Sequence, residues 1–198
     1  MSRDNLTPHP AHDTGRAFDE LLVTLVWAGD RRAAERLARR WQPRLLRTAR
    51  RLLLEEDAAL AVVQESWLAI LRGVNSLRDP AAFPPWAFSI VRRRAADRIR
   101  HMQAGRARDG GQVDALPLTA PDDRTEERLA ILQAFATLPD AQRLVAHLHY
   151  VEGLTLGEIA IAADIPEGTA KSRLFHARKQ LKRALDQSPP QSPEGDTP

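Results

Sequence analysis

The sequence contains no cysteine, which excludes disulfide bonds and metal sites built on thiolates. Aromatic residues make up only 5% of the chain, and no apolar run approaches the roughly 20 residues that a membrane-spanning helix needs. The first residues, MSRDNLTPHPAHD, contain no apolar segment of the kind found in secretory signal peptides. These absences lead us to expect a cytoplasmic protein.

Sequence signatures of common enzyme classes are missing as well. There is no P-loop, no G-x-S-x-G nucleophile motif and no dinucleotide-binding fingerprint. His147 and His149 have no third metal ligand nearby, and residues two apart on a helix point to different faces, so we expect packing or surface histidines. The acidic run Glu55–Asp57 fits the start of a helix better than a cation site. We predict no catalytic residue, no metal ion, no cofactor, and a protein that is not an enzyme.

The net positive charge is small, but the basic residues are unevenly distributed. The formal net charge is only +3, yet the pI is near 9.9 and the basic residues occur in clusters. Clustered cations favour a polyanionic partner. The hydrophobic content of 43% is sufficient for a core, and the apolar residues recur with helical rather than alternating spacing. An all-α protein is therefore predicted.

The chain divides into two stretches of helical periodicity. We expect one helical domain at 17–102 and a second at 125–186. Residues 103–124 lose all periodicity and contain adjacent glycines and two prolines, which is typical of a flexible linker. The polar ends, 1–16 and 187–198, have the composition of disordered tails. The predicted architecture is two small helical domains joined by that linker.

The first domain contains two helical patterns of interest. One apolar stripe consists of Ala34, Leu37, Trp41, Leu45, Ala49 and Leu52, and Pro43 is expected to kink or break its helix. A later helix opens at Pro84-Pro85-Trp86 and carries Arg92, Arg93, Arg94, Arg98 and Arg100 around its apolar stripe. An aromatic residue beside cations could stack the bases of single-stranded nucleic acid. Two interpretations remain open at this point: Trp86 as a stacking platform, or Trp86 as a core residue among solubilising arginines.

The stretch 155–185 predicts a helix–turn–helix. Thr155 and Glu158 form a T-x-x-E capping box for the first helix, and Pro166 suits the opening of the second. The second helix is expected to bury Ala170, Leu174, Ala177 and Leu181. Between Glu167 and Arg183 its outer face carries six cations against one acid. Such a face fits the major groove of duplex DNA, the alternative being a solvated, arginine-rich helix.

Five segments, in this order, resemble the extracytoplasmic-function (ECF) group of bacterial RNA polymerase sigma factors. They are WQPRLLRTARRLL (41–53), AALAVVQESWLAIL (58–71), FPPWAFSIVRRRAADRIR (83–100), LQAFATLPDAQRLVAHLHYVEGLTLGEIA (132–160) and IPEGTAKSRLFHARKQL (165–181). The resemblance covers about residues 18 to 186 and implies two helical domains, sigma regions 2 and 4. It also implies a dissociable specificity subunit that directs core RNA polymerase to promoters. A stand-alone helix–turn–helix regulator of transcription is the alternative.

The resemblance assigns roles to particular residues of this chain. Polymerase docking on the β′ clamp falls to Val63, Gln64 and Glu65, and the second domain is expected to meet the β flap. Recognition and melting of the minus-ten element falls to Trp86, Arg92, Arg93, Arg94 and Arg98. Recognition of the duplex minus-thirty-five element falls to Pro166, Gly168, Thr169, Lys171, Ser172, Phe175, His176 and Arg178. An anti-sigma factor is a further expected partner.

Four features depart from the family pattern. Alanines and a leucine occupy 58–61, where an acidic stretch is usual, and Arg93 stands where an asparagine is usual. Asp164 replaces a common turn glycine, which is compatible with the fold because Asp reaches the left-handed region at modest cost. His176 stands where arginine is frequent, so its charge is expected to depend on pH.

Overall fold

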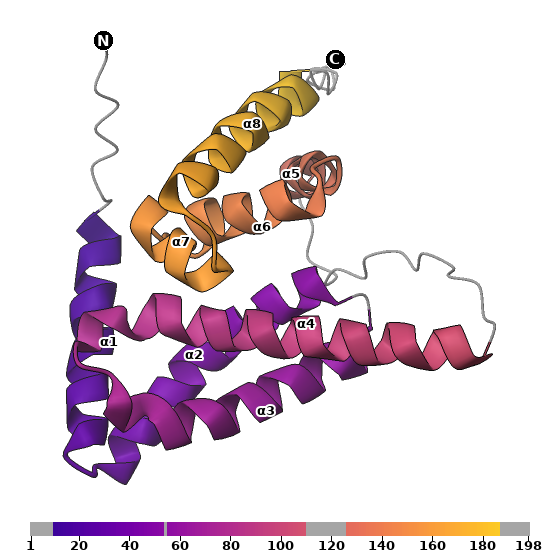
Figure 1. Cartoon of the computed structure of the whole chain (residues 1–198). Helices are drawn as coiled ribbons and strands as arrows, with labels where there is room; N and C mark the ends of the chain where they lie inside the picture. The colour runs from indigo at the N-terminus through magenta and orange to yellow at the C-terminus, as the bar shows by residue number, and fades with distance from the viewer. Residues whose placement is uncertain (1–9, 54, 110–125, 187–198) are drawn as a thin grey trace, which may run out of the picture.

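The computed structural model describes residues 10–53, 55–109 and 126–186, and helices are the only regular secondary structure among them (Figure 1). The all-α prediction is confirmed for this part of the chain. The first half comprises α1 (Pro10–Trp27), α2 (Arg31–Leu52), α3 (Glu56–Gly73), the short 3₁₀ turns η1 (Val74–Ser76) and η2 (Pro80–Ala82), and α4 (Phe83–Asp109). The second half comprises α5 (Glu126–Ala136), α6 (Asp140–Ala146), the π-helical turn η3 (His147–Val151), α7 (Leu156–Ala163) and α8 (Glu167–Asp186).

The first half is built around the buried stripe of α2. Leu37, Trp41, Leu45 and Ala49 recur at every fourth position and are almost completely removed from solvent. The indole of Trp41 meets the ring of Phe83 edge-on, with centroids 5.0 Å apart. Aromatic pairs in this T-shaped arrangement add to the stabilisation that burial itself provides. This core holds α2 and α4 in a fixed relation.

Local sequence signals set several helix ends. Asp30 caps α2 by accepting hydrogen bonds from the backbone N–H groups of Arg32 and Ala33. The capping box predicted at Thr155 and Glu158 is present, with both reciprocal hydrogen bonds formed. These caps satisfy backbone donors that have no partner inside the helix.

Pro43 does not end α2, which corrects the part of the sequence prediction that expected a break. The helix runs without interruption from Arg31 to Leu52 with Pro43 inside. Proline removes one backbone hydrogen bond, but Pro43 lies on an exposed side of the helix where water can solvate the freed carbonyl. Trp41 and Leu45, buried on the other side, hold the two halves of the helix in place.

Two predicted boundaries also change. α1 begins at Pro10 rather than near residue 17, and contacts with later helices hold Arg16 and the carbonyl of Gly15 within it. α4 continues to Asp109, seven residues into the segment expected to be linker, because Gln, Ala and Arg are good helix formers even where no apolar stripe continues. The predicted tails at 1–9 and 187–198, and the linker at 110–124, lie outside the described residues.

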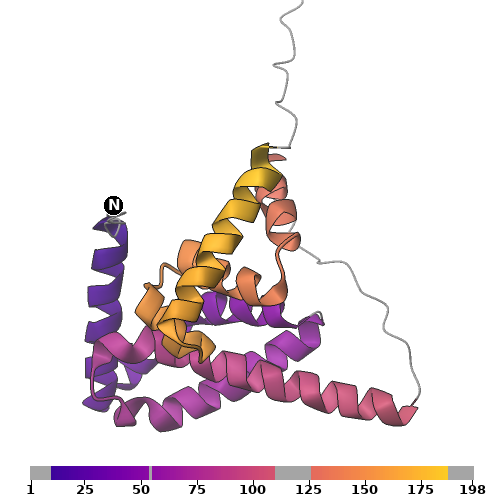
Figure 2. The same ribbon diagram turned by 45° about the horizontal axis from the view of Figure 1, so that its top comes forward.

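The two halves are helical domains in direct contact. Part of the second half packs around Phe135, Leu138, Ala146, Ala177 and Leu181. The main hydrophobic core, however, extends from the first half into α6, α7 and α8. α7 lies on α4, as the two views agree (Figures 1 and 2). The expected pair of helical domains is confirmed, and in this structure the second rests on the first.

Candidate nucleic-acid interface

The helix α8 separates an apolar face from a cationic one. Ala170, Ala177 and Leu181 are buried as predicted, while Leu174 is half-buried. The residues predicted to read duplex DNA occupy the opposite side: Pro166, Gly168, Lys171, Ser172, Phe175, His176 and Arg178 are exposed, and Thr169 is half-buried. The structure therefore brings the whole predicted set onto one accessible face.

Phe175 is the least expected member of this face. Its side chain is 64% exposed, and its ring meets that of His176 edge-on with centroids 5.5 Å apart. Within the part of the chain that the structure describes, Lys171, Arg178 and Lys182 make no ion pair, so their charges face solvent. An exposed apolar ring among unneutralised cations suits a groove that offers phosphates at its edges and thymine methyl groups on its floor.

The turn between α7 and α8 fixes the presentation of α8. Asp164 adopts the left-handed conformation, with φ 54° and ψ 56°, and so fills the role of the usual turn glycine, as predicted. The carbonyl of Pro166 then accepts hydrogen bonds from the N–H groups of Thr169 and Ala170. The first turn of α8 is thus anchored at its base.

The arginines of α4 have unequal surroundings. Arg93, Arg94 and Arg98 are exposed, although the guanidinium of Arg94 lies 4.0 Å from the Glu65 carboxylate. Arg92 is engaged by the second domain: its Nε donates to the carbonyl of Ala162 at 3.2 Å. Only three of the four predicted arginines are therefore free to meet a ligand in this arrangement.

Trp86 belongs to the edge of the core rather than to an open platform. Its ring packs against Phe83, with centroids 6.1 Å apart, and closes over Gly73, where an added Cβ would lie 3.0 Å from the indole. Between the two interpretations that the sequence left open, this geometry favours packing. Trp86 supports the η1–α4 corner that carries the arginines.

The residues of α3 that are predicted to dock on polymerase also differ in their exposure to solvent. Val63 is completely buried in the core, so it cannot touch a partner, and this corrects its assignment to a docking surface. Gln64 and Glu65 are exposed, and Leu68 beside them is 56% exposed. The missing acidic stretch has a physical reason here, because Ala58 and Ala59 are buried and carboxylates at those positions would lack solvation.

Comparison with known proteins matches a family to each half of the chain. Residues 37–104 match the family described as Sigma-70 region 2, and residues 128–181 match Sigma-70, region 4, together more than half of the chain. ECF RNA polymerase sigma factor SigM of Mycobacterium tuberculosis (strain ATCC 35801 / TMC 107 / Erdman) is 32% identical over 86% of this chain and 85% of its own. The chain belongs to the ECF sigma factors. Its role is that of an alternative sigma factor in transcription initiation.

Further similarity agrees with this membership. The ECF RNA polymerase sigma-E factor of Salmonella typhimurium (strain 14028s / SGSC 2262) is 29% identical over 82% of this chain and 92% of its own. Among solved structures, the sigma factor RpoE in complex with the anti-sigma factor NepR from Bartonella quintana has a TM-score of 0.66. It is 20% identical and the alignment covers 78% of this chain and 98% of that one, which shows a shared fold.

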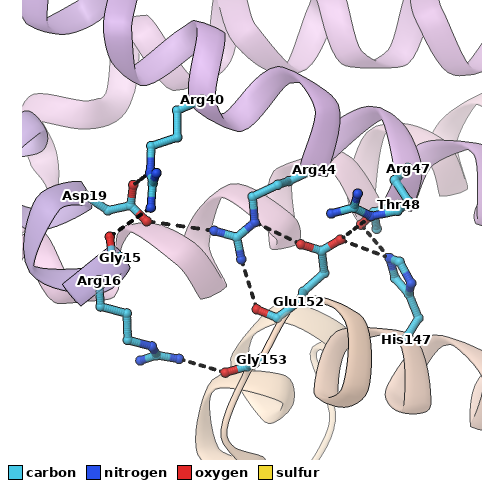
Figure 3. Close-up of polar contacts among 10 residues, drawn as sticks. All are labelled: Gly15, Arg16, Asp19, Arg40, Arg44, Arg47, Thr48, His147, Glu152 and Gly153. Carbon is cyan, nitrogen blue, oxygen red and sulfur yellow. Dashed lines mark hydrogen bonds and ion pairs between the residues drawn. The ribbon is translucent and has the colours of Figure 1, made fainter. Parts of the chain in front are cut away.

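This ECF sigma factor also contains a charged cluster that sequence reasoning missed. The carboxylate of Glu152, just after η3, lies between Arg44 and Arg47 of α2, with both Nε atoms 2.9 Å from its oxygens (Figure 3). His147 is buried beside it, and its Nε2 lies 2.9 Å from the Thr48 hydroxyl. No sequence signal could have found the cluster, because its members lie about a hundred residues apart.

Burial decides the protonation of His147. Removal from water, and then the nearby charges of Arg51 and Arg47, lower the pKa of its imidazole from 6.5 to about 3. The Glu152 carboxylate, 3.5 Å away, would favour the cation, but it already balances two guanidinium groups. His147 is therefore a neutral packing residue of the sigma factor, as the sequence predicted.

The described residues contain neither a candidate metal site nor a helix that could span a membrane. No group of three or more potential ligand side chains gathers there to hold a metal ion. None of the helices in those ranges is long and apolar enough to cross a membrane.

Proposed function

We propose that this sigma factor reads two promoter elements with its two domains while it is bound to core RNA polymerase. The observation that carries the proposal is the exposed face of α8, on which every predicted duplex-reading residue is at least partly accessible. Lys171 and Arg178 neutralise phosphates, and Ser172 reaches base edges in the major groove of the minus-thirty-five element. Phe175 contributes apolar contact with thymine.

The first domain acts on the minus-ten element. Arg93, Arg94 and Arg98 form the exposed cationic side of α4 and contact the backbone of the melted strand. Arg92 joins them once its contact with the second domain is released. Trp86 holds the corner that presents these side chains, since its ring is packed rather than open.

Core RNA polymerase is bound mainly through α3. Gln64 and Glu65 are the exposed polar residues of the docking surface for the β′ clamp, and Leu68 and Leu71 provide exposed apolar area beside them. The second domain meets the β flap. Binding polymerase and positioning it on a promoter account for this role, so the protein is not an enzyme. It works in the cytoplasm, where polymerase transcribes.

An anti-sigma factor is the proposed inhibitor. The solved relative from Bartonella quintana was crystallised with one, and exposed apolar side chains are present on both domains of this chain. Leu68 of α3, Ile161 of α7 and Phe175 of α8 are each more than half exposed. Surfaces of this kind favour a protein partner that covers them.

The decisive experiment is transcription by bacterial core polymerase on a promoter library, with and without the purified protein. Specific initiation from a small set of sequences that share two spaced elements is expected. Lys171→Glu should lower initiation from all of these promoters, whereas Arg39→Glu, at another exposed cation on α2, should leave initiation intact. A lack of added initiation would refute the proposal. Tight, polymerase-independent binding to duplex DNA would instead support the stand-alone regulator.

A further inference from the structure

Arg51, near the end of α2, carries a guanidinium group that has no anionic partner. Its side chain is half-buried, and among the residues that the structure describes it makes neither a hydrogen bond nor an ion pair. Its guanidinium carbon lies 5.1 Å from the centroid of the Phe135 ring of α5. Burial, and then the charges of Arg143 and Arg47, lower the pKa of Arg51 below the usual value for arginine. A cation that is largely removed from water normally has an anion beside it, and Arg51 has none.

Two further arginines gather around Arg51. Arg47 lies four residues earlier on α2, so both side chains project from the same side of that helix. Arg143 of α6 donates from Nη2 to the carbonyl of Ala136 at 3.3 Å, one residue beyond Phe135, which places its guanidinium group at the same end of α5. We name Arg47, Arg51 and Arg143 the arginine cluster.

The arginine cluster has more hydrogen-bond donors than acceptors. The Nε of Arg143 is buried and has no partner in the described part of the chain. The carboxylates that contact the cluster are already engaged or screened. Glu152 is shared by Arg47 and a second arginine of α2, and Asp140, 3.3 Å from Nη1 of Arg143, has a side chain that is 96% exposed. Negative charge is therefore lacking at Arg51.

We propose that the arginine cluster is a binding site for a small phosphate-type oxyanion, either inorganic phosphate or the terminal phosphate group of a small molecule. None of its three arginines is among the residues to which the proposed function assigns contact with DNA or polymerase. The site is therefore additional to that function and does not depend on it.

The geometry of the donors favours phosphate. Each planar guanidinium group presents paired N–H donors that match two phosphate oxygens, and a dianion with oxygens on several sides can accept from arginines of different helices at once. The C-terminal end of α5 would by itself repel an anion. Arg143 offsets this repulsion, because its Nη2 donates to the carbonyls of Ala136 and Leu138 there.

Calorimetric titration of the full-length protein with sodium phosphate and sodium pyrophosphate, at about pH 8 and constant ionic strength, measures the binding directly. Arg51→Gln should weaken the affinity at least about tenfold, because it removes charge-assisted hydrogen bonds. Arg36→Gln removes the same charge from an exposed position about 22 Å away along α2 and should change the affinity by less than about twofold. Equal weakening by the two variants, or no binding to the wild type, would overturn the inference.

Thermal unfolding separates an anion site from a packing role of Arg51 on Phe135. In chloride, Arg51→Met should unfold at the same temperature as the wild type or higher, because it removes a half-buried charge that has no partner. Phosphate stabilises proteins in general, so the quantity of interest is the additional upward shift in the wild type relative to Arg51→Met. An Arg51→Met protein that is less stable in chloride and gains as much from phosphate as the wild type would overturn the inference.

The nucleic-acid backbone offers similar phosphate chemistry and needs its own control. Duplex DNA of unrelated sequence should bind equally to wild type and Arg51→Gln, since the cluster is half-buried and lies apart from the exposed face of α8. If Arg51→Gln loses affinity for this DNA and the wild type binds no pyrophosphate, the cluster is a contact for the DNA backbone and the inference fails. Transcription assays do not enter these tests, so failure of the proposed function would leave the anion site standing.

Discussion

Acidification should destabilise this protein through a single buried histidine. His147 is completely buried, with Thr48 and Glu152 on one side of its ring and the guanidinium groups of Arg47 and Arg51 nearby. Its Nδ1 has no hydrogen-bond partner among the described residues. A proton there would place a charge in a site that is removed from water. Burial, and then the charges of Arg51 and Arg47, therefore lower the pKa of His147 to about 3.

The sign of the effect follows from the direction of the shift. Because the folded pKa lies below the unfolded value of 6.5, the unfolded chain binds a proton between pH 6.5 and about 3 that the folded chain does not. The contribution to stability is complete above pH 6.5 and decreases as the pH falls through that window. At pH 5 the loss amounts to about 2 kcal/mol, from 1.5 pH units at about 1.4 kcal/mol each.

Urea unfolding followed by tryptophan fluorescence, at pH 7 and pH 5 and constant ionic strength, measures this loss. Other groups also titrate over this range, so the quantity of interest is the difference between wild type and His147→Gln. Wild type should lose about 2 kcal/mol more than the variant. His101→Gln, at an exposed histidine of α4, is the control and should behave like wild type. Equal losses in wild type and His147→Gln would refute the assignment of His147 as a buried neutral group.

Four further outcomes test other parts of the structure. Trp41→Ala should lower the free energy of unfolding by about 3–5 kcal/mol in urea titrations, and a loss below about 1 kcal/mol would contradict its place at the centre of the core. Thr155→Ala should cost about 1 kcal/mol by removing the capping box, while Thr155→Ser should retain most of that stability. Lys171→Ala should reduce the slope of log K against log salt for promoter DNA by about 1, equally for all sequences, and a sequence-dependent effect would argue against a phosphate contact. Gln64→Ala and Glu65→Ala should weaken binding to core polymerase, measured by co-sedimentation, without changing the urea midpoint; unchanged affinity would remove α3 from the docking surface.

Sequence patterns were reliable where a few neighbouring residues decide the outcome. The buried and exposed sides of α8 follow from the spacing of Ala170, Ala177 and Leu181, since a helix repeats every 3.6 residues whatever surrounds it. The cap at Thr155 and the left-handed turn at Asp164 are equally local. The basic face proposed to meet duplex DNA was therefore visible in the sequence itself.

Tertiary packing decided the rest. Pro43 lies inside a continuous helix because the buried residues around it keep the chain helical. Val63 is not available for docking because the core covers its side chain. No local pattern could have joined Glu152 to Arg44 and Arg47, which lie 108 and 105 residues away. An ion pair over such a separation depends on how whole helices meet, and that relation is set by the shape of the shared core. The sequence by itself determined two helical domains and the face of one of them, and only the folded chain determined that these domains close on each other.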